Sequence, residues 1–353
     1  MSRYLNERFS NIVPYTPGEQ PKDMKYVKLN TNESPFAPSR RVADAAASQA
    51  RMLELYPTPE PKELCEKFAA VTGVDPECVM AVNGSDEVLN FAFALYCDKL
   101  HPAVFPDITY GFYEVFADAN GVPYEKIPLS ADFTVNADNY CGVGKTVFIA
   151  NPNAPTGVAL PLCDIERIVS SNRDNIVVVD EAYVDFGAES AARLIEKYDN
   201  LLVTQTFSKS RSMAGARLGF WIACKDIIKD LYTIRSSTNP YNVNRMTIAC
   251  GEAVLDDEAA TRENCRVIIK NREYLSSELS TLGFDLTASS ANFVFARHPS
   301  VSGQTLYLEL KRRGVLIRHF TGERIKDYNR ITVGSMEQIT ILIEKIKEIL
   351  EDA

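Results

Sequence analysis

Short apolar segments alternate with helical segments along the first two thirds of this chain. Helical periodicity appears over residues 86–100, 110–120 and 162–171, between the apolar segments. Strands joined through helices at this spacing predict an α/β fold, with a mostly parallel central sheet covered by helices on both faces. The strands are expected at residues 79–82, 104–105, 124–127, 147–150, 176–179, 201–203 and 220–223.

The character of the sequence changes after a long helical stretch at about residues 256–282. The segments that follow predict a smaller α+β unit, with strands at 292–296, 315–317 and 330–333 and helices at 303–313 and 337–350. We therefore expect a proline-marked N-terminal arm over 1–35, a large domain over 36–255 and a small C-terminal domain over 256–353, on which the N-terminal segment can pack.

The charge balance is acidic, with 38 Lys and Arg against 47 Asp and Glu, a formal charge of −9. The sequence has no excess of positive charge that would attract nucleic acid or an anionic membrane, so we expect neither as a partner.

The eight cysteines form no C-x-x-C pair, and the three histidines show no metal-ligand spacing, so no metal is expected. We see no signal peptide and no apolar run of about 18 residues, and expect a soluble cytoplasmic protein.

A single lysine follows the strand expected at 201–203. The hydroxyl residues Thr206 and Ser208 precede Lys209, and Arg217 comes eight residues after it. An amine is nucleophilic only when it is unprotonated, and a neighbouring cation favours the unprotonated form. The segment therefore suits a lysine that forms a Schiff base, beside an arginine that can also bind phosphate. Taken alone, a solvated loop explains it equally well.

Two other predicted strands are followed by residues that can bind a ligand. Gly84 and Ser85 open the helix after 79–82, where a flexible backbone and free N–H groups can bind an anion. Asp180 follows the strand at 176–179, where a carboxylate can hold a pyridinium N–H, and Tyr183 can reach a ring oxygen. An ordinary helix cap and a solvated loop carboxylate are the alternatives for these two segments.

A proline-locked turn at residues 151–157 follows another strand, and Asn153 in it can donate a hydrogen bond to a ring oxygen. Tyr110, beyond the strand at 104–105, can stack on a flat ring or simply pack in the core. In open α/β sheets, ligands bind at the carboxyl ends of the strands. Together these strand-end residues match the parts of pyridoxal 5'-phosphate, whereas no dinucleotide or P-loop glycine pattern occurs.

The residues just described belong to a set of segments spread over nearly the whole chain. The set comprises residues 29–35, 55–57, 83–87, 109–110, 151–157, 180–183, 206–217, 240–244, 291–293 and 330–334. In these segments the chain resembles the fold type I, class I/II PLP-dependent aminotransferases. Among them, it is most similar to the histidinol-phosphate aminotransferase family.

The resemblance implies that the large domain binds pyridoxal 5'-phosphate. It implies that Lys209 carries the cofactor, that Asp180 pairs with the ring nitrogen and that Tyr183 contacts the ring oxygen. These three residues are the expected catalytic ones. The other expected cofactor contacts are Gly84, Ser85, Asp86, Tyr110, Asn153, Thr206, Ser208 and Arg217.

The resemblance also implies a substrate site and a reaction. Arg330, helped by Arg318 and Tyr15, would bind the anionic end of the substrate, and Asn32 would lie nearby. Tyr56 would enter the site from a second subunit, so the working unit would be a homodimer. The expected transamination converts L-histidinol phosphate and the 2-oxo acid 2-oxoglutarate into imidazole acetol phosphate and L-glutamate, in histidine biosynthesis.

The sequence departs from the family pattern at two positions. Ala154 stands where the family usually has asparagine, so either Asn153 takes over the bond to the ring oxygen or Tyr183 makes it alone. Ile108 replaces a usual proline before the stacking tyrosine.

Other functions remain open at this point. An aromatic amino-acid aminotransferase and a PLP-dependent phosphoamino-acid decarboxylase share the fold. A PLP-binding regulatory module is disfavoured, because the chain has no room for a DNA-binding domain. The sequence leaves the preferred amino donor undecided.

Overall fold

A computed structural model describes residues 2–6, 9 and 12–352, so parts of the expected arm at 1, 7–8 and 10–11 lie outside the described residues. The largest element is a seven-stranded sheet in the order β2-β8-β7-β6-β5-β3-β4. Strands β7 to β4 run parallel, and β8 is antiparallel to both of its neighbours, which confirms the mostly parallel sheet. The strands are β2 (Val79–Val82), β3 (Ala103–Pro106), β4 (Tyr124–Ile127), β5 (Thr146–Ala150), β6 (Val177–Asp180), β7 (Leu201–Thr206) and β8 (Gly219–Ala223).

Alternate side chains of these strands enter two different cores. Val147 and Val177 belong to one core, whereas Phe148 and Val178 belong to the other. Successive side chains of a strand point to opposite faces, so a sheet covered on both faces needs continuous apolar runs. The first core is closed by α1 (Arg40–Ala50), α2 (Lys62–Thr72), α5 (Leu162–Ser171) and α7 (Arg245–Leu255), and the second by α3 (Ser85–Tyr96), α4 (Phe112–Asn120) and α6 (Lys225–Thr238).

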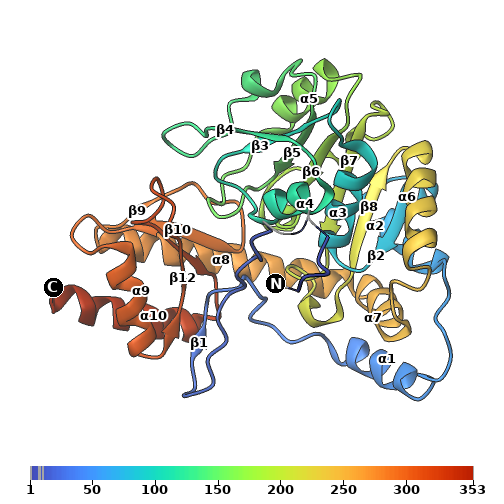
Figure 1. Ribbon diagram of the computed structural model, residues 1–353. Coiled ribbons are helices and arrows are strands. Elements are labelled where there is room, and N and C mark those ends of the chain that lie inside the picture. Colours follow the sequence, from blue (N-terminus) through green and yellow to red (C-terminus); the bar gives the residue numbers. More distant parts are fainter. Residues whose placement is uncertain (1, 7–8, 10–11, 353) are drawn as a thin grey trace.

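The C-terminal part forms a separate antiparallel sheet in the order β12-β13-β10-β9. Figure 1 shows this part, coloured orange to red, to one side of the large sheet, with the N-terminal strand β1 (Val27–Lys28) beside it. Strand β1 pairs in parallel with β11 (Val315–Leu316). The other elements are β9 (Asp285–Leu286), β10 (Phe293–Arg297), β12 (Arg318–His319), β13 (Asn329–Thr332), α8 (Glu258–Thr281), α9 (Gly303–Arg312) and α10 (Met336–Glu351).

Short 3-10 helices occupy several connections of the large sheet. These helices are η2 (Pro76–Cys78), η3 (Ala137–Tyr140), η4 (Val184–Phe186), η5 (Ala191–Leu194) and η6 (Ala214–Ala216). Two of them, η4 after β6 and η6 after β7, lie in connections that also carry residues of the site described below.

Some boundaries differ from the sequence-based expectation. Helix α3 ends at Tyr96 rather than near residue 100. Strand β7 continues to Thr206, because its hydroxyl-bearing end pairs with the antiparallel β8. Thr206 is therefore part of the sheet, whereas Ser208 lies in the turn that follows it.

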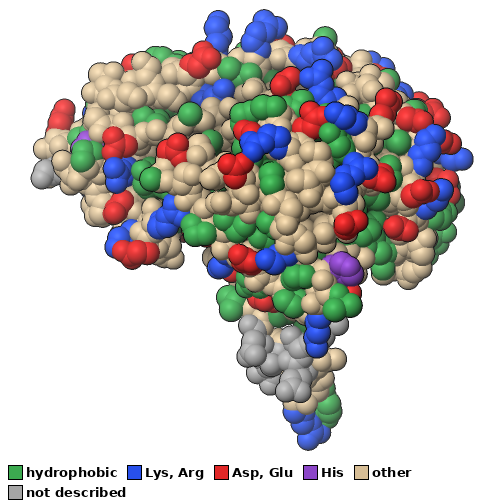
Figure 2. Space-filling model, turned by 90° about the horizontal axis from the view of Figure 1, so that it is seen from above, with side chains coloured by type: hydrophobic (Ala, Val, Ile, Leu, Met, Phe, Trp, Pro, Cys, Tyr) green, Lys and Arg blue, Asp and Glu red, His purple; other side chains and the backbone are tan. Residues whose placement is uncertain are grey.

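Charged side chains of both signs are mixed over the face seen in Figure 2. In residues 2–6, 9 and 12–352, none of the helices combines the length and apolar character needed to cross a membrane. The same described residues contain no group of three or more His, Cys, Asp or Glu side chains that could hold a metal ion. The eight cysteines are free thiols.

Candidate active site

Two adjoining cavities lie at the carboxyl ends of the parallel strands. The inner cavity, of about 210 Å³, reaches Asp180 and Arg217. The outer cavity, of about 540 Å³, reaches Arg318 and Arg330. The residues that line both cavities are Thr31, Tyr110, Ala154, Tyr183 and Lys209. The predicted lysine therefore lies where the two cavities meet.

One end of the inner cavity is built to hold an anion. Helix α3 begins at Ser85, after Gly84 with a φ of 78°. Residues with a side chain rarely adopt this φ, and a Cβ atom at Gly84 would lie 2.6 Å from Nη2 of Arg217, so the guanidinium would have to move. Arg217 donates from Nη1 to Oγ of Ser208 at 3.1 Å and from Nη2 to Oδ2 of Asp86 at 3.1 Å. A helix N-terminus, a guanidinium and a hydroxyl group together fit a phosphate.

Asp180, at the end of β6, is a buried carboxylate that lines the inner cavity. The Tyr113 hydroxyl donates to its Oδ2 at 3.1 Å, and the N–H of Ala182 donates to its Oδ1 at 3.2 Å. Burial raises the pKa of Asp180 to about 7, with a further increase from Asp86, although the two hydrogen bonds and Lys209 act in the opposite direction. Within the described residues, Asp180 forms no ion pair. A ligand that brings a cation, such as a protonated ring nitrogen, fits this carboxylate.

Lys209 follows β7 and faces both cavities. Its Nζ donates to the carbonyl oxygen of Thr31 at 3.2 Å and lies 5.8 Å from the ring centroid of Tyr183. The Tyr183 hydroxyl accepts a hydrogen bond from Nδ2 of Asn32 at 3.0 Å. Thr206 lines the inner cavity, and its hydroxyl lies 3.0 Å from Oγ of Ser208. The amine is thus placed between the anion site and the outer cavity.

Tyr110 closes one side of both cavities. Its hydroxyl donates to Oδ1 of Asp86 at 2.7 Å, which fixes the ring at the cavity wall. Burial raises the pKa of Tyr110, and the neighbouring Asp86 carboxylate adds to this effect. The phenol therefore stays protonated, and its ring offers a flat surface to a bound aromatic group.

The structure places Asn153 differently from our expectation. Its Nδ2 donates to the carbonyl oxygen of Ile108 and to the Thr156 hydroxyl, both at 3.0 Å. Its Oδ1 accepts from the Thr109 hydroxyl at 2.8 Å. Both amide hydrogens are engaged in holding the turn, and Ala154 lines the cavities instead. We therefore correct this assignment: Asn153 supports the turn and is not among the residues that line either cavity.

Two arginines of the C-terminal sheet face the outer cavity. Arg330, in β13, donates from Nη2 to the carbonyl oxygen of Asn30 at 3.1 Å, and its buried Nε has no hydrogen-bond partner among the described residues. Arg318, in β12, donates to the carbonyl oxygens of Pro17 and Thr16, at 3.1 and 2.8 Å. Burial lowers the pKa of Arg330. In the described part of the chain neither guanidinium has a carboxylate partner, so both suit an anionic ligand.

The two expected substrate tyrosines lie in different places. Tyr15 lines the outer cavity and stacks on Phe112, with ring centroids 4.2 Å apart. Tyr56 is 79% exposed and stacks on Tyr241, with centroids 4.6 Å apart. It lines neither cavity, so within one chain it does not reach the site.

Sequence reasoning missed two residues of the site. Tyr113 contacts Asp180, but from the sequence an aromatic residue three positions after Tyr110 in a helix is expected to be a core residue. Arg324 lines the outer cavity and donates to Oδ2 of Asp107 at 2.7 Å and to the carbonyl oxygen of Leu129 at 2.8 Å. No local pattern distinguishes Arg324 from a surface arginine.

Comparisons with known proteins agree with this geometry. The family model described as aminotransferase class I and II matches residues 24–346. "Histidinol-phosphate aminotransferase 1" of Bradyrhizobium diazoefficiens is 47% identical over 350 residues, which cover 99% of this chain and 100% of the relative. The histidinol-phosphate aminotransferase of Brachyspira hyodysenteriae is 43% identical over 354 residues and the full length of both chains.

The fold also matches a solved structure. The crystal structure of histidinol-phosphate aminotransferase from Sinorhizobium meliloti, in complex with pyridoxal-5'-phosphate, has a TM-score of 0.86 at 22% sequence identity. The match covers 93% of this chain and 92% of that chain. At this level of identity the likeness concerns the fold alone.

Proposed function

Since this chain belongs to the aminotransferase class I and II family, we propose that it transfers the amino group of L-histidinol phosphate to 2-oxoglutarate. The products are imidazole acetol phosphate and L-glutamate, and the reaction belongs to histidine biosynthesis. The observation that carries the proposal is the lining of the outer cavity, which includes Lys209, Arg318 and Arg330. Among the described residues, neither guanidinium group is paired with a carboxylate. Relatives with this activity in their names match over their whole length.

The cofactor contacts in this proposal follow from the inner cavity. Bound pyridoxal 5'-phosphate supplies a carbonyl carbon and an electron-withdrawing ring. Arg217, Ser208 and the first N–H groups of α3 hold its phosphate. Asp180 accepts a hydrogen bond from the ring nitrogen and keeps it protonated. Tyr110 covers one face of the ring.

Lys209 and the arginines act on the substrate. Lys209 would hold the cofactor in the resting enzyme, and its free amine would be placed to accept a proton from the reacting carbon of the donor. Arg330 and Arg318 bind the phosphate of the donor, which orients that carbon toward the lysine. Asn32 fixes the Tyr183 hydroxyl, which is 3.0 Å from its Nδ2, against the ring oxygen. Tyr15, stacked on Phe112, borders the substrate.

A homodimer in the cytoplasm is part of the proposal. Leu53, Leu55 and Tyr56 are large apolar side chains that are more than half exposed. Such a patch favours association with a second subunit, which would bring Tyr56 to the outer cavity of its partner. The exposed thiol of Cys163 suits a reducing compartment. The large domain over 36–255 and small domain over 256–353 remain our proposed division.

Product analysis tests the proposed reaction. Cofactor-loaded protein is incubated with L-histidinol phosphate and 2-oxoglutarate, and we expect one L-glutamate for each donor consumed. Failure to form glutamate would reject the proposal. Release of carbon dioxide from a phosphorylated amino acid, without consumption of 2-oxoglutarate, would indicate the decarboxylase alternative.

A pair of variants tests the anion site. Arg330→Met should raise the KM for histidinol phosphate about 100-fold, because a desolvated charge pair is lost. The matched control is Arg297→Met, which removes a guanidinium from the same sheet that is 47% exposed and paired with Asp285. The control should keep the wild-type KM. An unchanged KM in Arg330→Met would remove Arg330 from the substrate site.

A further inference from the structure

The side chains of the two residues after Lys209 form hydrogen bonds with a single carboxylate. The Ser210 hydroxyl donates to Oδ2 of Asp185, and Nη1 of Arg211 lies 3.0 Å from the same oxygen. Asp185 lies in η4, two residues after Tyr183. This carboxylate therefore joins the turn that carries the lysine to the loop that carries the tyrosine.

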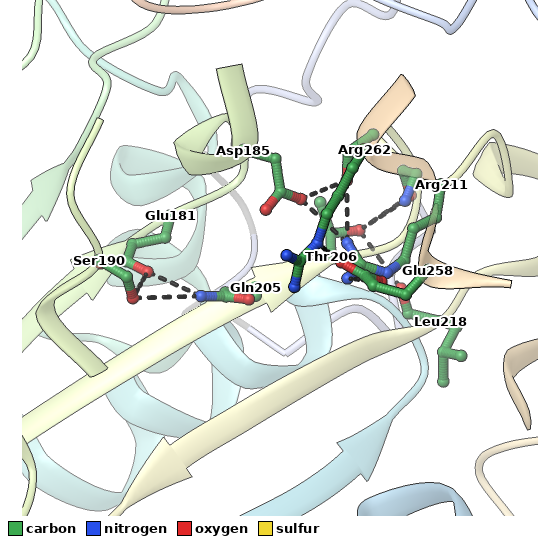
Figure 3. Close-up of polar contacts among 11 residues, drawn as sticks. Glu181, Asp185, Ser190, Gln205, Thr206, Arg211, Leu218, Glu258 and Arg262 are labelled. Atoms are coloured by element: carbon green, nitrogen blue, oxygen red, sulfur yellow. Dashed lines mark hydrogen bonds and ion pairs between the residues drawn. The ribbon is translucent and has the colours of Figure 1, made fainter. Parts of the chain in front are cut away.

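Arg211 is held on both sides. It is only 5% exposed, and its Nη2 donates to Oε2 of Glu258 at 3.0 Å. Its guanidinium carbon lies 4.7 Å from the ring centroid of Phe207, just before the lysine. Glu258 is the first residue of α8, where the helix dipole favours a negative charge. Figure 3 shows Arg211 between the carboxylates of Asp185 and Glu258.

This cluster lies outside the two cavities of the site. Asp185, Arg211 and Glu258 line a different cavity of about 500 Å³, and none of them lines the inner or the outer cavity. They therefore cannot touch a ligand bound there. Any effect they have on the reaction must pass through the residues to which they are attached.

The turn itself needs such support. Ser212 has a φ of 55°, a left-handed conformation that a non-glycine residue adopts rarely. Its hydroxyl lies 2.8 Å from Oγ of Ser34, and the N–H of Met213 donates to the carbonyl oxygen of Phe207 at 3.0 Å. The tertiary contacts of Ser210, Arg211 and Ser212 together fix the backbone on which Lys209 stands.

We propose that Asp185 and Arg211 are positioning residues that set the place of the Lys209 amine relative to Asp180 and Tyr183. The inference rests on the proposed function only for the role of Lys209. It is independent of which amino donor the protein uses. An amine displaced by about 1 Å from its reacting geometry loses on the order of 100-fold in rate, so the cluster controls turnover without contacting a substrate.

The experiment compares four variants. Asp185→Asn and Arg211→Met remove one charge each from this partly buried contact, Arg211→Lys keeps the charge, and Ser210→Ala removes one hydrogen bond to Asp185. The matched control is Arg262→Met, whose guanidinium also contacts Glu258, with Nε 3.3 Å from Oε1, but is 72% exposed. Among the described residues, the Arg262 side chain makes no hydrogen bond or ion pair with the lysine turn.

Two properties are measured on protein with equal cofactor content. The first is kcat per loaded site together with the KM for the amino donor. The second is a pH titration of the visible absorbance of the bound cofactor, measured without donor. The midpoint of this titration reports the protonation of the bond between the cofactor and Lys209. Asp185→Asn and Arg211→Met should lower kcat about 30-fold with KM changed less than about threefold, and should move the midpoint by about half a pH unit or more.

The milder variants keep the test decisive. Arg211→Lys should restore most of kcat, and Ser210→Ala should lower it by about threefold with a smaller midpoint shift in the same direction. Arg262→Met should match wild type in both properties. If Asp185→Asn and Arg211→Met fold and keep the wild-type kcat and midpoint while losing only thermal stability, the cluster is purely structural and the proposal fails.

If Asp185→Asn and Arg211→Met do not fold, a wild-type kcat and a wild-type midpoint in Ser210→Ala overturn the proposal. Failure of the proposed function would look different. In that case the wild-type protein would form no absorbing link with pyridoxal 5'-phosphate, or would form the link without producing glutamate.

Discussion

Asp180 and Glu181 are adjacent in the chain, and both are almost fully buried, yet their surroundings differ completely. Because successive residues at a strand end point to opposite faces, Asp180 faces the inner cavity and Glu181 faces the other side of the sheet. Burial raises the pKa of both carboxyl groups to about 7. Burial and pKa alone therefore do not distinguish a ligand site from a structural contact.

The hydrogen-bond partners make the distinction. Glu181 accepts from Ser190 Oγ at 2.6 Å, from the Ala191 N–H at 2.5 Å and from Gln205 Nε2 at 2.8 Å. Figure 3 shows Glu181 with Ser190 and Gln205. Asp180 accepts from two donors and has open space beside it. A satisfied carboxylate stabilises the fold, whereas a carboxylate beside a cavity is available to a ligand.

The largest expected difference between these two residues is in turnover. Asp180→Asn should lower kcat about 1000-fold while the cofactor stays bound, because the ring nitrogen loses its anionic partner. Glu181→Gln should keep kcat within about threefold, since its contacts are on the other face. Steady-state kinetics on cofactor-matched samples gives both values. Equal losses in the two variants would break the comparison.

Stability should show the opposite order. Glu181→Gln places an amide NH₂ against donors and should lower the free energy of unfolding by about 1–3 kcal/mol. Asp180→Asn should change it much less in protein without cofactor, because the substitution removes a buried charge that lacks a counter-ion. Urea unfolding of both variants without cofactor measures this difference. A larger loss in Asp180→Asn would contradict our description of its environment.

The pH dependence of stability separates the residues further. Both pKa values rise to about 7 in the folded protein, from 3.8 for Asp180 and 4.5 for Glu181, so the folded state keeps protons that the unfolded chain releases. Stability of the cofactor-free protein should therefore fall as pH rises from about 4 to 7. Unfolding curves across this range provide the measurement.

Cofactor binding should change only one of the two contributions. A ring cation beside Asp180 favours its ionised form, so pyridoxal 5'-phosphate should remove the contribution of Asp180 to this decline and leave that of Glu181. Glu181→Gln should flatten the remaining slope. A cofactor-loaded Glu181→Gln protein with the full slope of the unloaded wild type would refute this assignment.

The smallest effect is expected at Tyr113. Tyr113→Phe removes one of the two donors to Asp180 and should lower kcat by about three- to tenfold, because a single hydrogen bond contributes about 1 kcal/mol. Tyr140→Phe is the control, since the buried Tyr140 hydroxyl has no partner within the described part of the chain and lies in the opposite core. It should behave as wild type. Equal kcat in both variants would show that Tyr113 does not tune Asp180.

Periodicity predicted the fold well where each segment faces a core. Helix α5 and strand β2 have the expected limits, because their apolar positions are the buried ones. Strand β4, at the edge of the sheet, also has the expected limits, although none of its residues is fully buried. Helices α6 and α7 were not predicted. Helix α6 packs on α3 and β8, and α7 packs on α1 and α2, so the burial of Ile227, Leu231 and Ile248 depends largely on helices that are distant in the sequence.

For the site, strand-end position was the informative signal. Lys209, Asp180 and Arg217 line one cavity as the sequence indicated, because the parallel strands bring their carboxyl ends together. Asn153 could not be placed correctly, because the orientation of its amide depends on Thr109 and Ile108, more than forty residues away. Contacts of this kind, like that of Arg324 with Asp107, depend on packing that one sequence does not encode locally.

The most direct test of the proposed function is a single half-reaction. Cofactor-loaded protein is mixed with L-histidinol phosphate, and separately with L-phenylalanine and L-glutamate, and the loss of the visible cofactor absorbance is followed. We predict conversion with histidinol phosphate at least about tenfold faster than with phenylalanine, because two guanidinium groups face the donor phosphate. Rapid conversion with phenylalanine and little with histidinol phosphate would contradict the account, and would assign Arg330 to a carboxylate.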